Sequence, residues 1–260
     1  MERFNEKILI IAVIAIIAIS MSACKTDDSG PDFDGGTVEL GDTLKISGQV
    51  YICDLDAEYF PHYHPYNGAT YSVFTPTVET GQISTGQITN GKFNLSLGTP
   101  SPMFSFLIED LGISEPNYKS TNVPSSPPQS LALKYLVDCG KSPYCVLSRE
   151  NNTVENKNGT IYWANEWVTY VFVNTDATVS GEGGTYKNII YEEGIEWDQT
   201  TITTDFNFTL KKGWNSVYHF QGGSYTINNN TKTAISTITN SISLSNPPLR
   251  WVFWACEEHD

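Results

Sequence analysis

The residues best suited to chemistry lie in one short stretch, Asp54–Tyr66, which combines acidic, histidine and aromatic side chains. His62 and His64 are two positions apart, so on an extended backbone both side chains point to the same side. Imidazole nitrogens and carboxylate oxygens are ligands that zinc and other transition metals accept. The candidate metal ligands are His62, His64, Asp54 and Asp56.

Two other interpretations of this stretch stay open. Its acidic residues alone could attract calcium, but the stretch lacks the glycine that lets an EF-hand loop turn sharply. Its histidines and tyrosines could also stack on one another and on the prolines of a solvent-facing loop that holds no metal. We expect no bound cofactor in this protein.

Aromatic side chains suggest a second kind of site, because exposed rings on loops of β-proteins often stack against sugar rings. The candidate ligand-binding residues of the first half are Tyr59, Phe60, Tyr63 and Tyr66. The aromatics of the second half that suit the same role are Trp163, Trp197 and Tyr191. The tryptophans that we expect in the core instead are Trp167, Trp214 and Trp251.

Residues for covalent or acid–base catalysis are few. Glu192, Glu193 and Glu196 could form the acid pair of a glycosidase, but acids beside a glycine between two strands are more typical of a charged loop. The chain has no G-x-S-x-G elbow, no H-E-x-x-H zinc motif and no dinucleotide fingerprint. We therefore expect a protein that is not an enzyme.

The first element in the chain is an apolar N-terminal segment. Twelve uninterrupted apolar residues, Ile8–Ile19, follow a short charged stretch. As a helix they would span about 18 Å, against about 30 Å of bilayer hydrocarbon. That length suits the core of a secretory signal peptide, and an uncleaved membrane helix is the alternative.

The next residues, Met21-Ser22-Ala23-Cys24, resemble the lipobox of bacterial lipoproteins. In that family the peptide is cut before the cysteine, whose thiol receives a diacylglycerol. The resemblance implies a signal peptide over residues 1–23, lipidation of Cys24 and a tether over residues 24–42. It also implies a cell-envelope protein anchored in a membrane, which we expect to be the outer membrane; the sequence leaves the face of that membrane open.

The net charge limits the classes of binding partner, and the cysteine content indicates the redox state of the compartment. A net charge of −14 without a basic cluster argues against nucleic acid and against anionic lipid headgroups. Lipidation of one cysteine leaves an even set in an oxidising compartment, which suits disulfides. A turn-rich spacer favours a Cys139–Cys145 pair and leaves Cys53–Cys256 by elimination. A zinc site is the alternative, although no C-x-x-C pair is present.

Hydrophobic periodicity indicates strands after residue 42. The segments expected as strands include 44–52, 92–97, 232–244 and 249–255. Asn90-Gly91 supplies a tight hairpin turn. Trp167–Val173 is apolar on both faces, so we expect a central strand that is covered on both sides.

Two further segments complete the pattern. Residues 205–221 are expected to form one hairpin with Lys211-Lys212-Gly213 at its turn, because apolar residues alternate on both sides of that turn. Residues 111–158 are rich in proline, serine and asparagine, and we expect a connector there.

Three short motifs of the first half resemble the carboxypeptidase-regulatory-like family. They are Ile46-Ser47-Gly48-Gln49-Val50, Asn67-Gly68-Ala69-Thr70 and the segment 86–97. Members of that family are small prealbumin-like β-sandwiches with an accessory, non-catalytic role. The resemblance implies such a sandwich over residues 43–110 and carries over no catalytic residue.

These features predict an all-β protein with two β-sandwich domains, over residues 43–110 and 159–260, joined by a connector over residues 111–158. We expect it to present a non-catalytic binding or scaffolding surface to a protein or glycan ligand at the cell envelope. The alternative is an extracytoplasmic hydrolase or metal-dependent enzyme.

Overall fold

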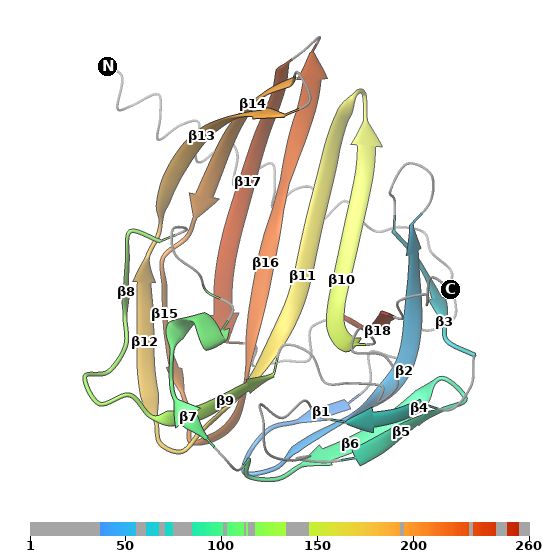
Figure 1. Ribbon diagram of the computed structural model, residues 1–260, viewed down its shortest axis with the longest axis vertical. Coiled ribbons are helices and arrows are strands. Elements are labelled where there is room, and N and C mark those ends of the chain that lie inside the picture. The colour runs from blue at the N-terminus through green and yellow to red at the C-terminus, as the bar shows by residue number, and fades with distance from the viewer. Residues whose placement is uncertain are drawn as a thin grey trace. The chain divides into compact units, whose positions relative to one another are not determined.

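The computed structural model describes residues 37–55, 61–67, 71–74, 85–100, 103–111, 113, 118–133, 146–192, 195–228, 231–242 and 249–254. All of these residues belong to the second of two compact units into which the chain divides, Asp34–Asp260. Apart from one 3₁₀ helix, every regular element that the structure describes is a strand (Figure 1). The predicted all-β class is confirmed.

The elements of the first half are β1 (Thr37–Glu39), β2 (Leu44–Leu55), β3 (Pro61–Pro65), β4 (Tyr71–Phe74), β5 (Thr85–Thr89), β6 (Lys92–Leu97), β7 (Phe104–Ser105), η1 (Ile108–Leu111), β8 (Ser120–Asn122) and β9 (Gln129–Leu133). Those of the second half are β10 (Val146–Lys157), β11 (Thr160–Val173), β12 (Ala177–Glu182), β13 (Gly184–Glu192), β14 (Ile195–Thr203), β15 (Phe206–Leu210), β16 (Gly213–Asn228), β17 (Thr231–Ile242) and β18 (Arg250–Trp254). Strands β8, β9 and β10 lie in the segment that the sequence predicted as a connector.

One large sheet holds most of these strands, in the order β13–β14–β17–β16–β11–β10–β18–β2–β6–β5–β4. Strand β2 changes partners along its length: residues 44–49 pair with β6, residues 51–55 pair with β3, and β1 pairs with residues 45–47. The last strand, β18, runs parallel to β2, with Phe253 opposite Ile52. The two ends of the described chain therefore meet in neighbouring strands.

A small sheet of three strands, β15–β12–β8, lies apart from the large one. The hairpin predicted over residues 205–221 is wrong, because β15 pairs with β12 whereas β16 pairs with β11 and β17. The side chain of Asn215 fixes the turn between them by accepting from the Lys211 N–H at 2.8 Å and donating to the Lys211 carbonyl at 2.7 Å. The turn thus carries the chain from one sheet to the other.

Two apolar clusters lie on opposite faces of β11. Val168, Tyr170 and Phe172 belong to one cluster, and Val171 and Val173 belong to the other. The first cluster includes residues of β2 and β6, and the second includes residues of η1 and the small sheet. Residues 168–173 therefore form the central, doubly covered strand that the sequence predicted.

Residues of both predicted domains share one core. Leu44 and Leu95, from the predicted first sandwich, belong to the same cluster as Tyr170 and Trp251. The division into two separate sandwich domains is therefore not confirmed. Details within the first region do agree with the sequence: Phe93, Leu95 and Leu97 are buried in alternation along β6.

The turn between β5 and β6 also has the predicted form. Asn90 and Gly91 adopt φ values of 51° and 70°, which is the left-handed backbone of a tight hairpin turn. Asn158 and Gly159 repeat this geometry between β10 and β11, with φ values of 54° and 81°. That second turn lies where the sequence analysis placed the end of the connector.

Several strands of the large sheet extend beyond the two apolar clusters. We call this part the distal half. It consists of residues 150–157, 160–167, 195–203, 221–228 and 231–238, where β10, β11, β16, β17 and β14 run side by side (Figure 1). Its side chains are mostly half-buried. The face that carries Tyr170 is called the first face, and the face that carries Val171 is the second face.

Candidate functional site

Aromatic side chains gather around one lysine on the second face of the distal half. The Lys232 Nζ lies 3.5 Å from the centroid of the Trp197 ring and 3.8 Å from that of Tyr225. Trp163 lies on the same face, because cross-strand register places it opposite Gly223, two residues before Tyr225. We call Trp163, Trp197, Tyr225 and Lys232 the aromatic surface.

Small residues separate the rings of the aromatic surface. Gly223 lies opposite Ser236, and Tyr225 lies opposite Ala234. A Cβ atom added at Gly223 would lie 2.0 Å from the Ile235 carbonyl oxygen, so only glycine allows β16 and β17 to approach this closely. The rings of Trp163 and Tyr225 therefore lie opposite small residues on the neighbouring strands.

The structure separates the three aromatics that the sequence singled out in the second half. Trp163 and Trp197 share the second face, whereas Tyr191 lies on the first face opposite Glu196. The Tyr191 hydroxyl donates to Glu196 Oε2 at 3.0 Å, and this bond raises the pKa of Tyr191. Of the acids considered for a glycosidase pair, Glu196 is thus hydrogen-bonded to a tyrosine, and Glu193 lies outside the described residues.

Strand β3 carries the two candidate metal-binding histidines. His62 lies opposite Asp54, and His64 Nε2 is 3.6 Å from Asp54 Oδ2. The two histidines and Asp54 therefore share one side, as their spacing predicted. In the part of the chain that the structure describes, no group of three or more histidine, cysteine or acidic side chains could hold a metal ion. Asp56 lies outside that part, and the metal site stays a prediction.

Two of the aromatics predicted to bind a ligand make contacts within the protein. The Tyr63 hydroxyl accepts from the Asn152 N–H at 2.7 Å, and the Arg250 guanidinium lies 4.7 Å from the centroid of its ring. Burial raises the pKa of Tyr63. Tyr66 is buried in the first cluster, with its ring centroid 5.6 Å from that of Phe253.

The contacts of Tyr63 reach β10 and β18, and the ring contact of Tyr66 reaches β18. Tyr59 and Phe60, the other two candidates in this stretch, lie outside the described residues.

Cys53 has no disulfide partner among the described residues, and burial raises the pKa of its thiol. Its predicted partner Cys256 lies outside the described residues, as do Cys24, Cys139 and Cys145. The parallel pairing of β18 with β2 brings the strand that precedes Cys256 beside the strand that contains Cys53. The disulfide pairing stays a prediction.

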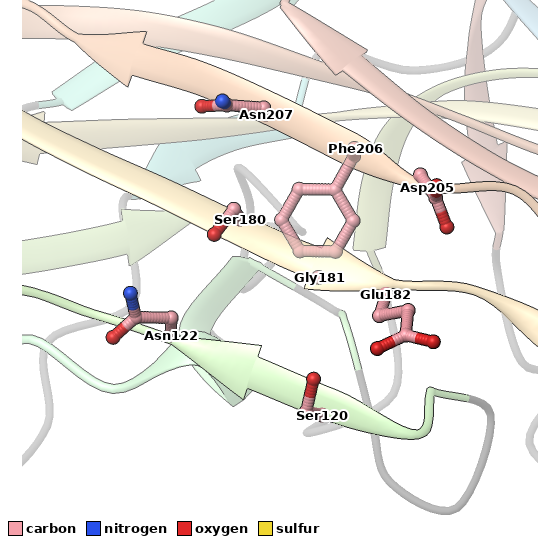
Figure 2. Close-up of a pocket in the computed structure, with 8 residues that line it drawn as sticks. All are labelled: Ser120, Asn122, Ser180, Gly181, Glu182, Asp205, Phe206 and Asn207. Carbon is pink, nitrogen blue, oxygen red and sulfur yellow. The ribbon is translucent and has the colours of Figure 1, made fainter.

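A polar groove crosses the small sheet (Figure 2). Its lining consists of Ser120, Asn122, Ser180, Gly181, Glu182, Asp205, Phe206 and Asn207. Asn122, Ser180 and Asn207 form one cross-strand row, because Ser180 lies opposite both asparagines.

Both carboxylates of this groove already have partners. Glu182 accepts from Lys119 Nζ at 3.1 Å, and Asp205 accepts from the Gly183 N–H at 2.7 Å. The Phe206 ring belongs to the second cluster, so the groove offers amide and hydroxyl groups without an open aromatic face.

The sequence analysis missed a buried polar network at the base of the distal half. His219 is 1% exposed, with Nδ1 at 2.6 Å from Asn240 Oδ1 and Nε2 at 3.1 Å from Thr169 Oγ1. The Asn240 amide nitrogen donates to the Tyr118 hydroxyl. The Asn240 oxygen therefore accepts from His219 Nδ1–H, and His219 Nε2 accepts from the Thr169 hydroxyl.

Trp167 covers this network, since its ring stacks on His219 with centroids 5.0 Å apart. Trp167 is half-buried, whereas Trp214 and Trp251 lie in the first cluster as predicted. Thr169, His219 and Asn240 lie on the same face of the neighbouring strands β11, β16 and β17, and the signal in the sequence was a polar residue at an inward position of each strand.

No helix among the described residues combines the length and the hydropathy that crossing a membrane requires. Comparisons with protein-family models, with curated proteins and with solved structures find no match to this chain.

Proposed function

We propose that this chain is an acyl-anchored protein of the cell envelope that binds glycans, without catalysis, at its aromatic surface. The observation that carries this proposal is the placement of the Lys232 ammonium within 4 Å of the centroids of both the Trp197 and the Tyr225 rings. Cation–π contacts of this kind fix the orientation of the rings before a ligand arrives.

The chemistry of the surrounding residues favours sugars over other ligands. Aromatic faces stack on the C–H faces of sugar rings, and amide side chains on the same face can read hydroxyl groups. Asn165 and Gln221 lie opposite each other on the second face, and Gln199 lies opposite Ala234. A net charge of −14 disfavours polyanionic ligands, so we expect neutral glycans.

A glycan array followed by calorimetry on the full chain in detergent tests the binding. We expect Trp197→Ala and Tyr225→Ala to abolish the binding heat of any glycan that the array identifies. Tyr162→Ala is the matched control, because Tyr162 lies on the opposite face of β11 from Trp163 and outside strand β13. A blank array, or equal losses in all three variants, would reject the proposal; binding to a protein partner instead would favour the scaffolding role.

The anchor has its own test. If Cys24 carries a diacylglycerol, the wild-type protein partitions into detergent, and Cys24→Ser moves it to the aqueous phase. Mass spectrometry of residue 24 decides directly, since an unmodified thiol contradicts the anchor and, with it, the proposed location at the outer membrane.

An alternative function, an extracytoplasmic hydrolase or metal-dependent enzyme, draws support from the shared side of His62, His64 and Asp54. Calorimetry with zinc, on the wild type and on a His62→Ala/His64→Ala double variant, tests it. Zinc heat that disappears in the double variant favours this alternative, and equal heat in both proteins removes it.

We also propose that the two apolar clusters are the interiors of two layers packed on opposite faces of the large sheet, which is common to both. Limited proteolysis tests this arrangement, because two independent domains would give two stable fragments, whereas a common layer gives none. A Cys53–Cys256 disulfide, which peptide mapping without reductant can detect, would hold the last strand beside β2.

A further inference from the structure

Strand β13 forms one end of the order of strands in the large sheet. It pairs with β14 on one side, and within the described part of the chain no strand pairs with its other side. Two apolar side chains on this strand are widely exposed, Ile189 by 57% and Tyr191 by 74%. The outer edge of β13 therefore offers unpaired backbone groups beside exposed apolar side chains, which together form a template for another strand.

The sequence of β13 carries little of the protection that such edges usually have. Natural edge strands are kept apart by prolines, by bulges or by several charges. Between Gly184 and Glu192 this strand has no proline and two charged residues, Lys187 and the terminal Glu192. Its register with β14 runs without interruption over all nine residues.

We propose that β13 is a dimer interface, at which the same strand of a second copy adds in antiparallel orientation. A twofold axis perpendicular to the sheet at Ile189 places Ile189 opposite Ile189 and Lys187 opposite Tyr191 of the second copy. Residues opposite each other across an antiparallel pair share a face, so these pairs meet side chain to side chain.

Charge complementarity selects the second copy as the occupant. On the first face, the Tyr191 hydroxyl is held by Glu196 on β14. Each Lys187 therefore approaches a tyrosine ring and a carboxylate of the other copy, and the twofold axis makes this contact twice. A peptide from an unrelated protein would have to supply the same lysine spacing by chance, whereas an identical strand supplies it by symmetry.

The proposed interface has a geometric consequence for the distal half. A twofold axis perpendicular to the sheet keeps the second faces of both copies on the same side. The two aromatic surfaces would then lie on one continuous sheet and could engage a repeating ligand together. The dimer itself does not depend on the glycan proposal, since Lys187, Ile189 and Tyr191 lie on the first face.

Sedimentation analysis of the full chain in density-matched detergent, over a range of concentrations, tests the proposal. We expect a monomer–dimer equilibrium in which Ile189→Lys and Lys187→Glu each weaken the dimer by about tenfold or more, since like charges then meet across the strands. Ile227→Lys is the matched control, because Ile227 is 54% exposed at the end of the interior strand β16. The control should dimerise like the wild type.

A charge exchange gives the sharper result. The Lys187→Glu/Glu196→Lys double variant should recover dimerisation that Lys187→Glu alone loses. Hydrogen exchange should show amides of β13 protected in the dimer and open in the Lys187→Glu monomer. Circular dichroism identifies any variant that fails to fold. If Ile189→Lys does not fold, Lys187→Glu and the Lys187→Glu/Glu196→Lys double variant still test the interface. A wild type that stays monomeric, or a dimer equally weakened by Ile227→Lys, overturns the proposal.

Discussion

The two ends of β11 show how differently one strand can be used. Residues 168–173 are buried on both faces, whereas residues 160–167 are half-buried on both. Among the described residues, neither apolar cluster includes a side chain from the second of these segments. Hydrophobic packing thus holds the strand at one end, and the other end is left to display side chains.

The largest effect should come from removing a core tryptophan. Trp251 is 0% exposed and packs edge-on against Phe93, with centroids 5.0 Å apart. We expect Trp251→Ala to lower the free energy of unfolding by about 3–5 kcal/mol, because a large cavity forms. Trp163→Ala, in the distal half, should cost about 1 kcal/mol or less. Urea unfolding followed by circular dichroism measures both, and equal costs would erase the distinction between the two ends.

The buried network at the junction should have the next largest effect. Asn240→Leu removes the acceptor of His219 Nδ1–H and the donor to Tyr118, so it should cost about 1–3 kcal/mol. Hydrogen exchange should show the distal strands β16 and β17 opening first in this variant. Thr239→Leu is the control, because Thr239 lies on the opposite face of β17. Equal opening in both variants would show that the buried network around His219 does not hold the distal strands in place.

The distal half should be sensitive at one glycine. At Gly223 a Cβ atom would meet the Ile235 carbonyl oxygen at 2.0 Å, so Gly223→Ala should cost about 1–2 kcal/mol as the strands separate. Gly98→Ala is the matched control, since a Cβ atom there meets nothing within 4 Å. The melting temperature of Gly223→Ala should be clearly lower than that of Gly98→Ala. Identical melting temperatures would show that β16 and β17 can separate enough to accept the added Cβ atom without a loss of stability.

The smallest effect concerns alkaline pH. Burial and the hydrogen bond to Glu166 raise the pKa of Tyr218 above its ordinary value of 10. Above that pH the unfolded chain ionises this tyrosine while the folded chain keeps it neutral, so the free energy of unfolding falls as pH rises. Tyr218→Phe should therefore lose less stability between about pH 10 and pH 11. Denaturant midpoints across this range measure the slope, and an unchanged slope contradicts the assignment.

Local sequence signals correctly predicted those features that a strand or turn determines by itself. The alternation in β6 and the doubly apolar run of β11 indicated which side chains are buried. Asn90-Gly91 indicated its turn, and Asn158-Gly159 carried the same signal. Strand β10 was missed because it is polar on both faces, as its place in the distal half permits.

The features that local patterns did not predict depend on contacts between segments that are far apart in the chain. Phe206 and Trp214 flank one turn and read as a hairpin, yet they belong to different clusters on opposite faces of the large sheet. The residue types of Tyr63 and Tyr66 predicted ligand binding, but not their contacts with Asn152, Arg250 and Phe253, which come from distant strands.

The sequence by itself determined that the described chain is built of strands, and which side chains alternate along each of them, because periodicity is a property of a single strand. Only the tertiary structure decided what each face meets. Trp197 and Lys232 come together through the parallel pairing of β14 with β17, and no local pattern encodes which distant strand will be the neighbour.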